Sequence, residues 1–324
     1  MSAPARTNRE AFMNAIAAQH EAPVRRAAFR TTWRRSTLVP YILIGPALIC
    51  LITFSVLSIL VAALVSLTNL DIGGLGDYTQ VRFIGLHNYQ TMFGDPAFWE
   101  ALGNTAFFVV VGVPTLVIGS LAIAIALNFS RSRLFRALRA FYFVPAITAI
   151  VAISLIWGNL YNSQFGLLNW LLSTVGVAPV AWLTDPTIAK LSVAFVAIWR
   201  GSGLDIIIFL AALQAIPPEY YEAAAVDGAG EWQKIFRITV PLMRFAIFFV
   251  TVTTLINWMQ FFDEPYVLTQ GGPVHATTSM SLYIYQQGFR YNEFGFASAA
   301  SIVLFAIIAA VTVLQVRARQ GGDV

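Results

Sequence analysis

Long apolar runs without a charged residue dominate the chain, and the short segments between them hold most of the charged side chains. An apolar helix needs about 20 residues to cross the hydrocarbon core of a bilayer. The uncharged runs reach this length, and a helix satisfies its own backbone hydrogen bonds in lipid. The pattern predicts an all-α integral membrane protein with six transmembrane helices, near residues 41–67, 104–127, 141–161, 190–213, 243–262 and 296–316.

The composition supports a membrane location and excludes several soluble classes. Hydrophobic residues make up 58% of the 324 positions and charged residues 11%, against roughly 25% charged residues in an ordinary soluble domain. A soluble domain of this size could not hide so much apolar side chain from water. Cys50 is the single cysteine, which excludes a disulfide scaffold.

The basic residues indicate how the chain is oriented in the membrane. Most of the 20 Lys and Arg residues precede the first predicted span, follow the second, separate the fourth from the fifth, or follow the sixth. Basic residues accumulate in cytoplasmic loops, so we expect both termini in the cytoplasm. Residues 1–37 are then expected to form a basic, disordered cytoplasmic tail that can touch anionic membrane lipid. Residues 38–317 are expected to form the membrane domain, and residues 318–324 a cytoplasmic C-terminal tail. The net charge of +4 follows from this topology, and we expect no nucleic-acid binding.

The sequence holds no recognisable catalytic or metal-binding constellation. His20, His87 and His275 fall on different predicted loops or sides, which predicts no metal cluster. No nucleophile and base stand at a recognisable spacing. Lys190 and Lys234 do not follow glycine, so the chain has no phosphate-binding P-loop. We therefore expect no enzyme activity and no cofactor, and any ATP hydrolysis in a separate subunit.

The segment between the fourth and fifth predicted spans predicts two short cytoplasmic helices. Pro217 and Pro218 suit a helix start, and Glu222 lies favourably near the positive N-terminal end. Gly228 can supply a left-handed C-terminal cap. A second helix over residues 231–239 is expected to end before a proline. From the pattern alone, the segment is either an ordinary amphipathic connector or a helix that fits a groove of another protein.

This segment, residues 217–241, resembles the EAA loop of bacterial ABC-importer permeases. Glu222-Ala223-Ala224, Gly228, Ile238 and Pro241 stand at the family's spacing, and Val240 replaces the usual leucine. In that family the loop is the coupling helix that docks into a cleft of the ATPase subunit. The resemblance implies five contact candidates, Glu222, Ala223, Ala224, Asp227 and Gly228.

Further motifs resemble the carbohydrate-uptake permeases of this kind. They are Phe83-Ile84-Gly85-Leu86-His87-Asn88-Tyr89, Gly166 to Asn169, Trp182 to Pro186, and Tyr266 to Pro273. The resemblance runs from about residue 38 to 316, and it favours the first-permease type, like the larger maltose permease but without its extra N-terminal spans. It implies a six-span type I permease core in a bacterial inner membrane.

The same resemblance implies partners and a transport mechanism. The expected partners are a second, non-identical permease, an ATPase dimer at the cytoplasmic face that binds ATP and Mg, and an extracytoplasmic solute-binding protein. The expected substrate is an oligosaccharide, a monosaccharide, or a related polyol or glycerol phosphate. The expected mechanism is alternating access driven by ATP.

Two charged residues interrupt the fourth predicted span. Each intramembrane ionisable group costs about 2.5–3.5 kcal/mol on insertion scales, which makes Arg200 and Asp205 functional candidates. They project about 140° apart on a straight helix, which would not pair them well. Gly201 and Gly203 could bend or unwind the helix, as in other transporters. Alternatively, each charged group pairs with a polar group on a neighbouring span.

The fifth predicted span combines polar and aromatic side chains, which suits a sugar. Aromatic residues at helical spacing are nevertheless more often packing residues. In the maltose relative, the fourth and fifth spans line the sugar site. Together with this resemblance, the sequence predicts eight substrate-pathway residues: Arg200, Gly201, Leu204, Asp205, Thr254, Asn257, Trp258 and Phe261.

Two other functions stay open from the sequence. An ion-coupled secondary transporter could use Arg200 and Asp205 as a coupling pair, and its uptake would then follow the ion gradient. A membrane-embedded enzyme could use outer-loop carboxylates, although the sequence lacks a catalytic constellation.

Overall fold

The computed structural model describes residues 39–129 and 142–320. The predicted tail over residues 1–37, the basic segment after the second predicted span, and the last four residues of the predicted C-terminal tail lie outside the described residues. The chain divides into two compact units, Met1–Ser55 and Val56–Val324.

Every regular element of the described residues is a helix, and the first half of the chain holds, besides the helical residues 142–147, the following elements in this order. They are α2 (Val39–Leu51), η1 (Ile52–Val56), α3 (Leu57–Val65), α4 (Ile72–Gly76), η2 (Tyr78–Gln80), α5 (His87–Gly94), α6 (Pro96–Phe129) and α8 (Ile150–Leu160). An isolated bridge joins Thr68 to Phe83.

The second half continues with α9 (Leu167–Thr174), α10 (Pro186–Gln214), α11 (Glu219–Val226), α12 (Glu231–Lys234), η3 (Ile235–Thr239) and α13 (Val240–Leu242). It ends with α14 (Arg244–Met259), η4 (Pro265–Thr269), α15 (Met280–Tyr285), η5 (Gln286–Arg290) and α16 (Phe294–Gln320). The prediction of an all-helical membrane fold is confirmed.

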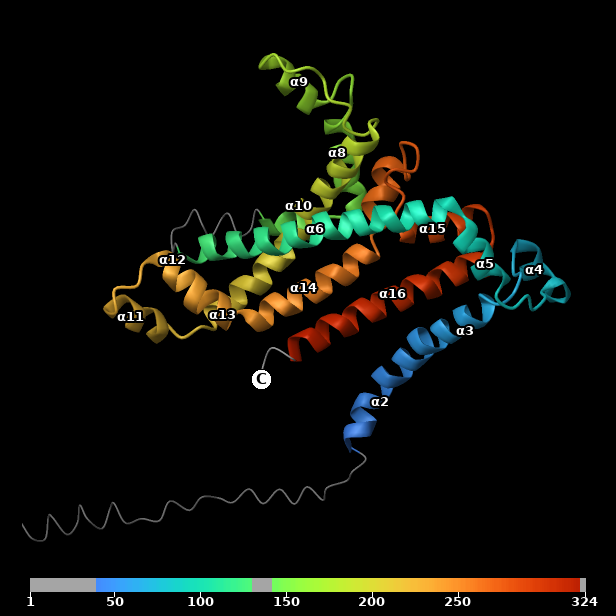
Figure 1. Cartoon of the computed structure of the whole chain (residues 1–324), viewed down its shortest axis with the longest axis horizontal. Helices are drawn as coiled ribbons and strands as arrows, with labels where there is room; N and C mark the ends of the chain where they lie inside the picture. Colours follow the sequence, from blue (N-terminus) through green and yellow to red (C-terminus); the bar gives the residue numbers. More distant parts are fainter. Residues whose placement is uncertain (1–38, 130–141, 321–324) are drawn as a thin grey trace, which may run out of the picture. The chain divides into compact units, whose positions relative to one another are not determined.

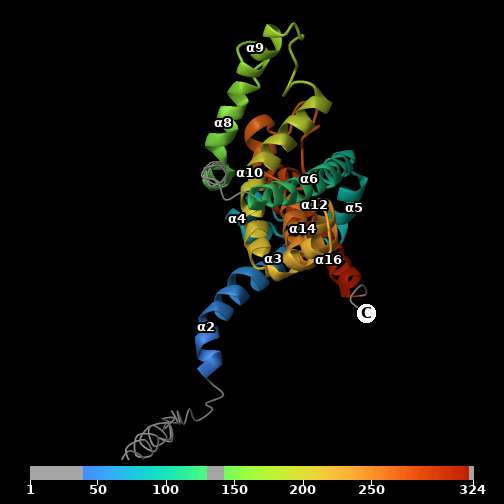
Figure 2. The same cartoon turned by 90° about the vertical axis from the view of Figure 1, so that its left-hand side faces the viewer.

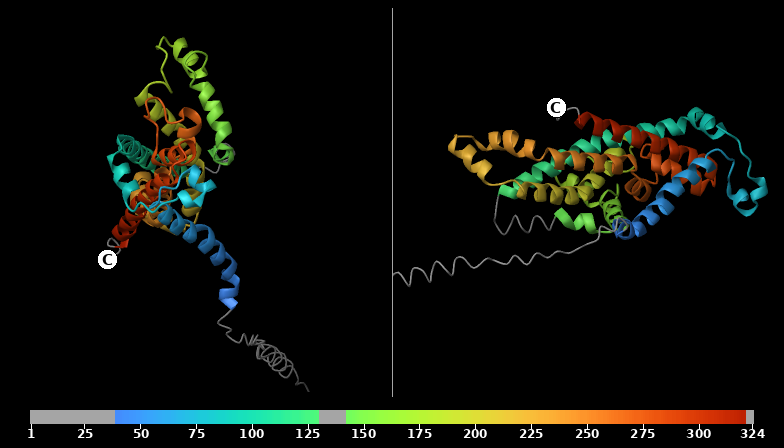
Figure 3. Two further views of the ribbon diagram at one scale, coloured as in Figure 1. Left: turned by 90° about the vertical axis from the view of Figure 1, so that its right-hand side faces the viewer. Right: turned by 90° about the horizontal axis from the view of Figure 1, so that it is seen from below.

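The larger unit is organised around long helices that lie side by side. Helix α6 contacts both α10 and α14, and α14 also contacts α10 and α16 (Figure 1). Figure 2 shows α6 and α14 close together from the side. Helices α9 and α11 lie at opposite ends of α10 (Figure 1), and Figure 3 shows α11 beyond the ends of the long helices.

The core between α6, α10 and α14 is built from large apolar side chains. Phe108, Leu116, Ile206, Phe209 and Val250 are all buried in one cluster. Such packing holds helices together in lipid, where close van der Waals contact replaces the hydrophobic effect as the driving force. A second buried cluster joins α5, α6, α15 and α16.

The number of membrane spans remains a prediction. Within residues 39–129 and 142–320, four segments are long and apolar enough to cross a membrane: Tyr41–Val65, Pro96–Asn128, Pro186–Gln214 and Phe294–Arg319. The pair Glu231–Leu242 and Arg244–Met259 qualifies as a fifth only if its 67° bend lies within one span.

The third predicted span, over residues 141–161, is interrupted in the structure. Residues 142–147 are helical, but the chain leaves the helix before α8, where Ala149 has φ −58° and ψ 129°. Helix α8 has only 11 residues, which is short of the length that a bilayer requires.

The fifth predicted span begins and ends differently from its prediction. The helical chain passes through Pro241 and breaks at Met243, and α14 ends at Met259. The helical run from Glu231 to Leu242 therefore continues through Pro241 and ends beyond residue 239, its predicted end. The sequence prediction that this helix ends before Pro241 is wrong.

Candidate functional site

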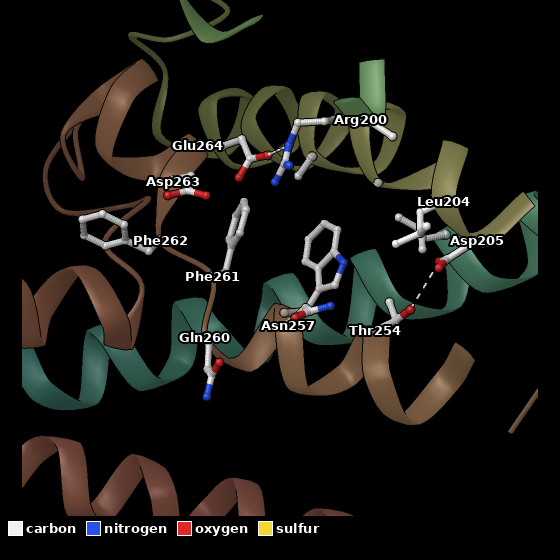
Figure 4. Close-up of a pocket in the computed structure, with 15 residues that line it drawn as sticks. Arg200, Leu204, Asp205, Thr254, Asn257, Gln260, Phe261, Phe262, Asp263 and Glu264 are labelled. Carbon is white, nitrogen blue, oxygen red and sulfur yellow. Dashed lines mark hydrogen bonds and ion pairs between the residues drawn. The ribbon is translucent and has the colours of Figure 1, made fainter. Parts of the chain in front are cut away.

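One cavity brings together the residues that the sequence singled out in the fourth and fifth predicted spans. Its volume is about 420 Å³, within the range of typical ligand pockets. All eight predicted pathway residues line it, namely Arg200, Gly201, Leu204, Asp205, Thr254, Asn257, Trp258 and Phe261. Figure 4 shows that its labelled side chains come from α10, from α14 and from the segment that follows α14.

Seven further lining residues are absent from the predicted set: Leu116, Ala146, Ala197, Gln260, Phe262, Asp263 and Glu264. Leu116 belongs to α6 and Ala146 to the helical residues before α8, so these two come from elements that carry no polar signal in the sequence. The polar and aromatic residues of this group, Gln260, Phe262, Asp263 and Glu264, follow α14. Their polar and aromatic side chains are the sequence signal by which they could have been added to the predicted pathway.

Arg200 is held by an ion pair that crosses between two elements. Its Nε donates to Oε1 of Glu264 over 2.8 Å (Figure 4). The Glu264 side chain is only 1% exposed, whereas that of Arg200 is 30% exposed. A buried carboxylate needs such a partner, because its desolvation costs several kcal/mol. The pair therefore joins α10 to the segment that follows α14.

Asp205 is tied to α14 by a separate contact. The hydroxyl of Thr254 donates to Oδ2 of Asp205 over 3.3 Å, and both residues are buried. Arg200 and Asp205 therefore each bond to a neighbouring element, which is one of the two arrangements that the sequence left open. They form no ion pair with each other, although the secondary-transporter alternative relies on such a pair.

Helix α10 is continuous from Pro186 to Gln214, so the unwinding considered at Gly201 and Gly203 does not occur. These glycines serve close packing instead. A Cβ at Gly203 would lie 2.3 Å from the backbone oxygen of Tyr142, and one at Gly201 would lie 2.9 Å from Leu116. Small residues at such contacts let membrane helices approach closely.

Two aromatic side chains form part of the cavity wall. The rings of Trp258 and Phe261 are stacked, with centroids 5.0 Å apart and planes 26° apart. Phe108 packs edge-on against Phe261 at 5.0 Å. Trp258 and Phe261 are 6% and 7% exposed, so each ring is mostly core and meets the cavity with a small part of its surface.

The Trp258 indole lies against the backbone of α6. A Cβ at Gly112 would lie 2.2 Å from the indole ring, so the position of Trp258 depends on a glycine there. No sequence pattern links Gly112 to Trp258, because the two positions are far apart along the chain.

The predicted coupling residues gather on one exposed helix and its C-terminal cap. Helix α11 is followed by Gly228 at φ +77°. The Gly228 N–H donates to the Ala225 carbonyl and the Ala229 N–H to the Ala224 carbonyl, which is the Schellman arrangement. Four of the five candidates, Glu222, Ala223, Asp227 and Gly228, are exposed, and Ala224 is half-buried.

Two asparagine side chains tie loops to helices, Asn88 of the motif Phe83 to Tyr89 and Asn104 of α6. Asn88 Nδ2 donates to the carbonyls of Ser66 and Thr68 at 2.8 Å each. Asn104 Nδ2 donates to the carbonyls of His275 and Thr278 at 2.9 and 3.0 Å. These side chains satisfy loop backbone that would otherwise lack partners.

Among the residues that the structure describes, no three His, Cys, Asp or Glu side chains are grouped as metal ligands.

Comparison with known proteins identifies the family. The profile of the binding-protein-dependent transport system inner membrane components matches residues 96–320. The chain belongs to this family. It is therefore a membrane permease component, as the resemblance of its motifs predicted.

The relatives are sugar transport permeases of similar length. The lactose transport system permease protein LacF of Rhizobium radiobacter is 34% identical, over 88% of this chain and 97% of its own length. The trehalose/maltose transport system permease protein MalF of Thermococcus litoralis is 32% identical, over 87% of this chain and 94% of its own. These relatives support the predicted carbohydrate-uptake ABC permease family.

A solved structure shares the fold. A chain in the crystal structure of a bacterial alginate ABC transporter, bound to an alginate pentasaccharide-bound periplasmic protein, matches with a TM-score of 0.73 and 25% identity. The match covers 87% of this chain and 93% of that chain. The permease fold predicted from the sequence is therefore confirmed.

Proposed function

We propose that this chain is the transmembrane permease subunit of an ATP-driven importer that moves a carbohydrate through the cavity beside α10 and α14. Membership of the family and the sugar permeases among the relatives support the class of function. The observation that carries the proposal is the cavity itself. The eight residues predicted for the substrate pathway, from the fourth and fifth predicted spans, all line it.

The cavity wall suits a polyhydroxylated ring. Asn257 and Gln260 provide amide donors and acceptors, and Trp258 and Phe261 provide apolar surface. Sugars need both, because hydroxyl groups require hydrogen bonds while C–H faces pack on aromatic rings. Relatives named for lactose and for trehalose and maltose support a substrate built from such rings.

Coupling to ATP is proposed to pass through α11. The predicted contacts for an ATPase dimer, Glu222 to Gly228, stand exposed on this helix. The Tyr221 hydroxyl lies 3.0 Å from the Thr239 hydroxyl, so α11 is linked to η3 and hence to α13 and α14. Closure of the ATPase dimer would move this segment and switch the cavity between outward and inward access.

The remaining parts of the importer follow from this assignment. ATP and Mg would be bound by the ATPase dimer, since this chain has no P-loop. A second, non-identical permease would complete the pathway, and an extracytoplasmic solute-binding protein would deliver the sugar to the outer loops. Both termini would lie in the cytoplasm of a bacterial inner membrane.

Energy coupling in proteoliposomes tests the proposal. The complete transporter, purified with its partner subunits and binding protein, should import sugar only when the ATPase subunits can reach ATP. Dissipating ion gradients with ionophores should leave uptake unchanged. Uptake that continues without ATP and stops when an ion gradient collapses would instead establish a secondary transporter.

A further inference from the structure

The cavity wall holds more acidic than basic side chains. Among the lining residues there is one cation, Arg200, and there are three carboxylates, on Asp205, Asp263 and Glu264. Even without Asp205, which lies inside the fourth predicted span, two carboxylates remain for one cation. This chain therefore presents a negative wall to the cavity.

The charge of Arg200 is already compensated within the protein. Its Nε bonds to the buried carboxylate of Glu264 at 2.8 Å. This ion pair and Lys234–Glu231 join described residues, and neither pair includes Asp205 or Asp263. The remaining guanidinium N–H groups can still donate hydrogen bonds to neutral hydroxyls.

Asp263 lies where an incoming solute would meet its charge. It is exposed, lies next to Glu264 in the sequence, and lines the same cavity (Figure 4). A negative group on a solute would approach this carboxylate near the protein surface, where like charges a few ångströms apart still repel each other more strongly than in bulk water. Such repulsion is a usual means of excluding a wrong ligand.

We propose that this wall selects uncharged sugars and rejects sugars that carry a carboxylate or sulfonate, with Asp263 and Glu264 as the specificity-determining residues. Asp263 supplies the repulsion, and Glu264 keeps Arg200 from acting as an anion site. This inference rests on the proposed sugar pathway and specifies in addition that the transported sugar is uncharged.

A cysteine in the cavity can report the sign of its potential. The single native cysteine, Cys50, is replaced by serine, and Asn257→Cys is introduced into the complete transporter in nanodiscs. Rates of modification are measured with a cationic trimethylammonium methanethiosulfonate and an anionic sulfonate methanethiosulfonate, each relative to its rate with a free thiol. The cationic reagent should be favoured by roughly tenfold.

Charge-neutralising variants then locate the source of this preference. Asp263→Asn and Glu264→Gln should each reduce the preference several-fold, and glutamine can still accept the Arg200 hydrogen bond. Glu100→Gln, the same change at an exposed outer position of α6 that does not line this cavity, should leave it unchanged. A preference for the anionic reagent, or none, would overturn the inference.

Sugar protection separates this inference from the proposed function. The thiol introduced by Asn257→Cys is reacted with uncharged N-ethylmaleimide in the presence of glucose, galactose, maltose or lactose, or of glucuronate or galacturonate. At least one neutral sugar should slow the reaction, and the uronates should do so only in Asp263→Asn or Glu264→Gln. Equal protection by uronates overturns the charge inference and keeps the sugar pathway. Protection by no sugar contradicts both.

Discussion

Gly228 shows how one backbone angle can matter to α11, the proposed coupling helix. At φ +77° it ends α11 in the left-handed region, and no heavy atom lies within 4 Å of the position that a Cβ would take. A side chain there would meet free space, so the main cost is the backbone conformation itself, about 1–2 kcal/mol for a residue with a Cβ.

We expect Gly228→Val to reduce ATP-driven uptake at least about tenfold, because a β-branched residue resists this conformation and the exposed cap would change shape. Gly228→Asn should retain most of the uptake, since asparagine tolerates the left-handed region. Gly230→Val is the matched control, because Gly230 has φ −72° and also has free space around its Cβ position. Uptake by Gly228→Val at the wild-type rate would remove α11 from the coupling path.

Gly112 is a second glycine whose missing Cβ matters to the cavity, because the Trp258 indole occupies that space. A methyl group there would overlap the Trp258 indole, and the indole would have to move within a packed core. We expect Gly112→Ala to destabilise the protein by about 1–3 kcal/mol and to reduce sugar uptake. Thermal unfolding and tryptophan fluorescence would measure the shift.

Gly119→Ala is the control for this prediction, since it lies on the same helix with free space around its Cβ position. Alanine is favoured over glycine in a helix, so Gly119→Ala should be neutral or slightly stabilising. An equal effect of the two substitutions would show that Trp258 does not depend on the missing Cβ at Gly112.

At the scale of elements, the Arg200–Glu264 pair links α10 to the chain that follows α14. Removal of its two partners should not be equivalent. Arg200→Ala leaves a carboxylate that is 1% exposed, whereas Glu264→Ala leaves a guanidinium that is 30% exposed and can reach water. We expect Arg200→Ala to destabilise by about 3 kcal/mol and Glu264→Ala by less.

The double variant provides the check on this pair. Thermal unfolding of Arg200→Ala/Glu264→Ala should show a smaller loss than the sum of the single changes. The surface pair Lys234–Glu231, whose glutamate is 64% exposed, is the comparison, and Glu231→Ala should cost at most about 1 kcal/mol. Additive losses at Arg200 and Glu264 would mean that the pair contributes nothing as a unit.

For the whole molecule, the proposed orientation places the loop before α15 and the segment over residues 217–241 on opposite sides of the membrane. Val274 is 81% exposed in the loop before α15, and Trp232 is 73% exposed in α12. With Cys50 replaced by serine, Val274→Cys should react with an impermeant maleimide in intact cells. Trp232→Cys should react only after the membrane is opened, and the reverse result would refute the assignment of the termini to the cytoplasm.

Local signals were enough to predict several features of this protein. The lack of charge predicts a helical membrane protein, since lipid leaves backbone groups no other partner. Pro217, Pro218 and Gly228 mark the ends of α11 correctly, because helix ends depend on a few adjacent residues. The EAA spacing and the motifs over residues 83–89 and 266–273 predict the family, because each motif is a short run of residues that can be read directly from the sequence.

The tertiary structure decided what depends on packing between distant segments. The sequence marks Arg200 as costly in a membrane but does not identify Glu264 as its partner, and the two stand 64 positions apart. Three other features could not be predicted from neighbouring residues either. They are the interruption before α8, the continuity of α10, and the contact between Gly112 and Trp258. They depend on which faces of the helices meet, and that register is set by close packing over the whole bundle. The sequence alone thus determined the class of protein and its chemical candidates, whereas only the folded chain placed those candidates around one cavity.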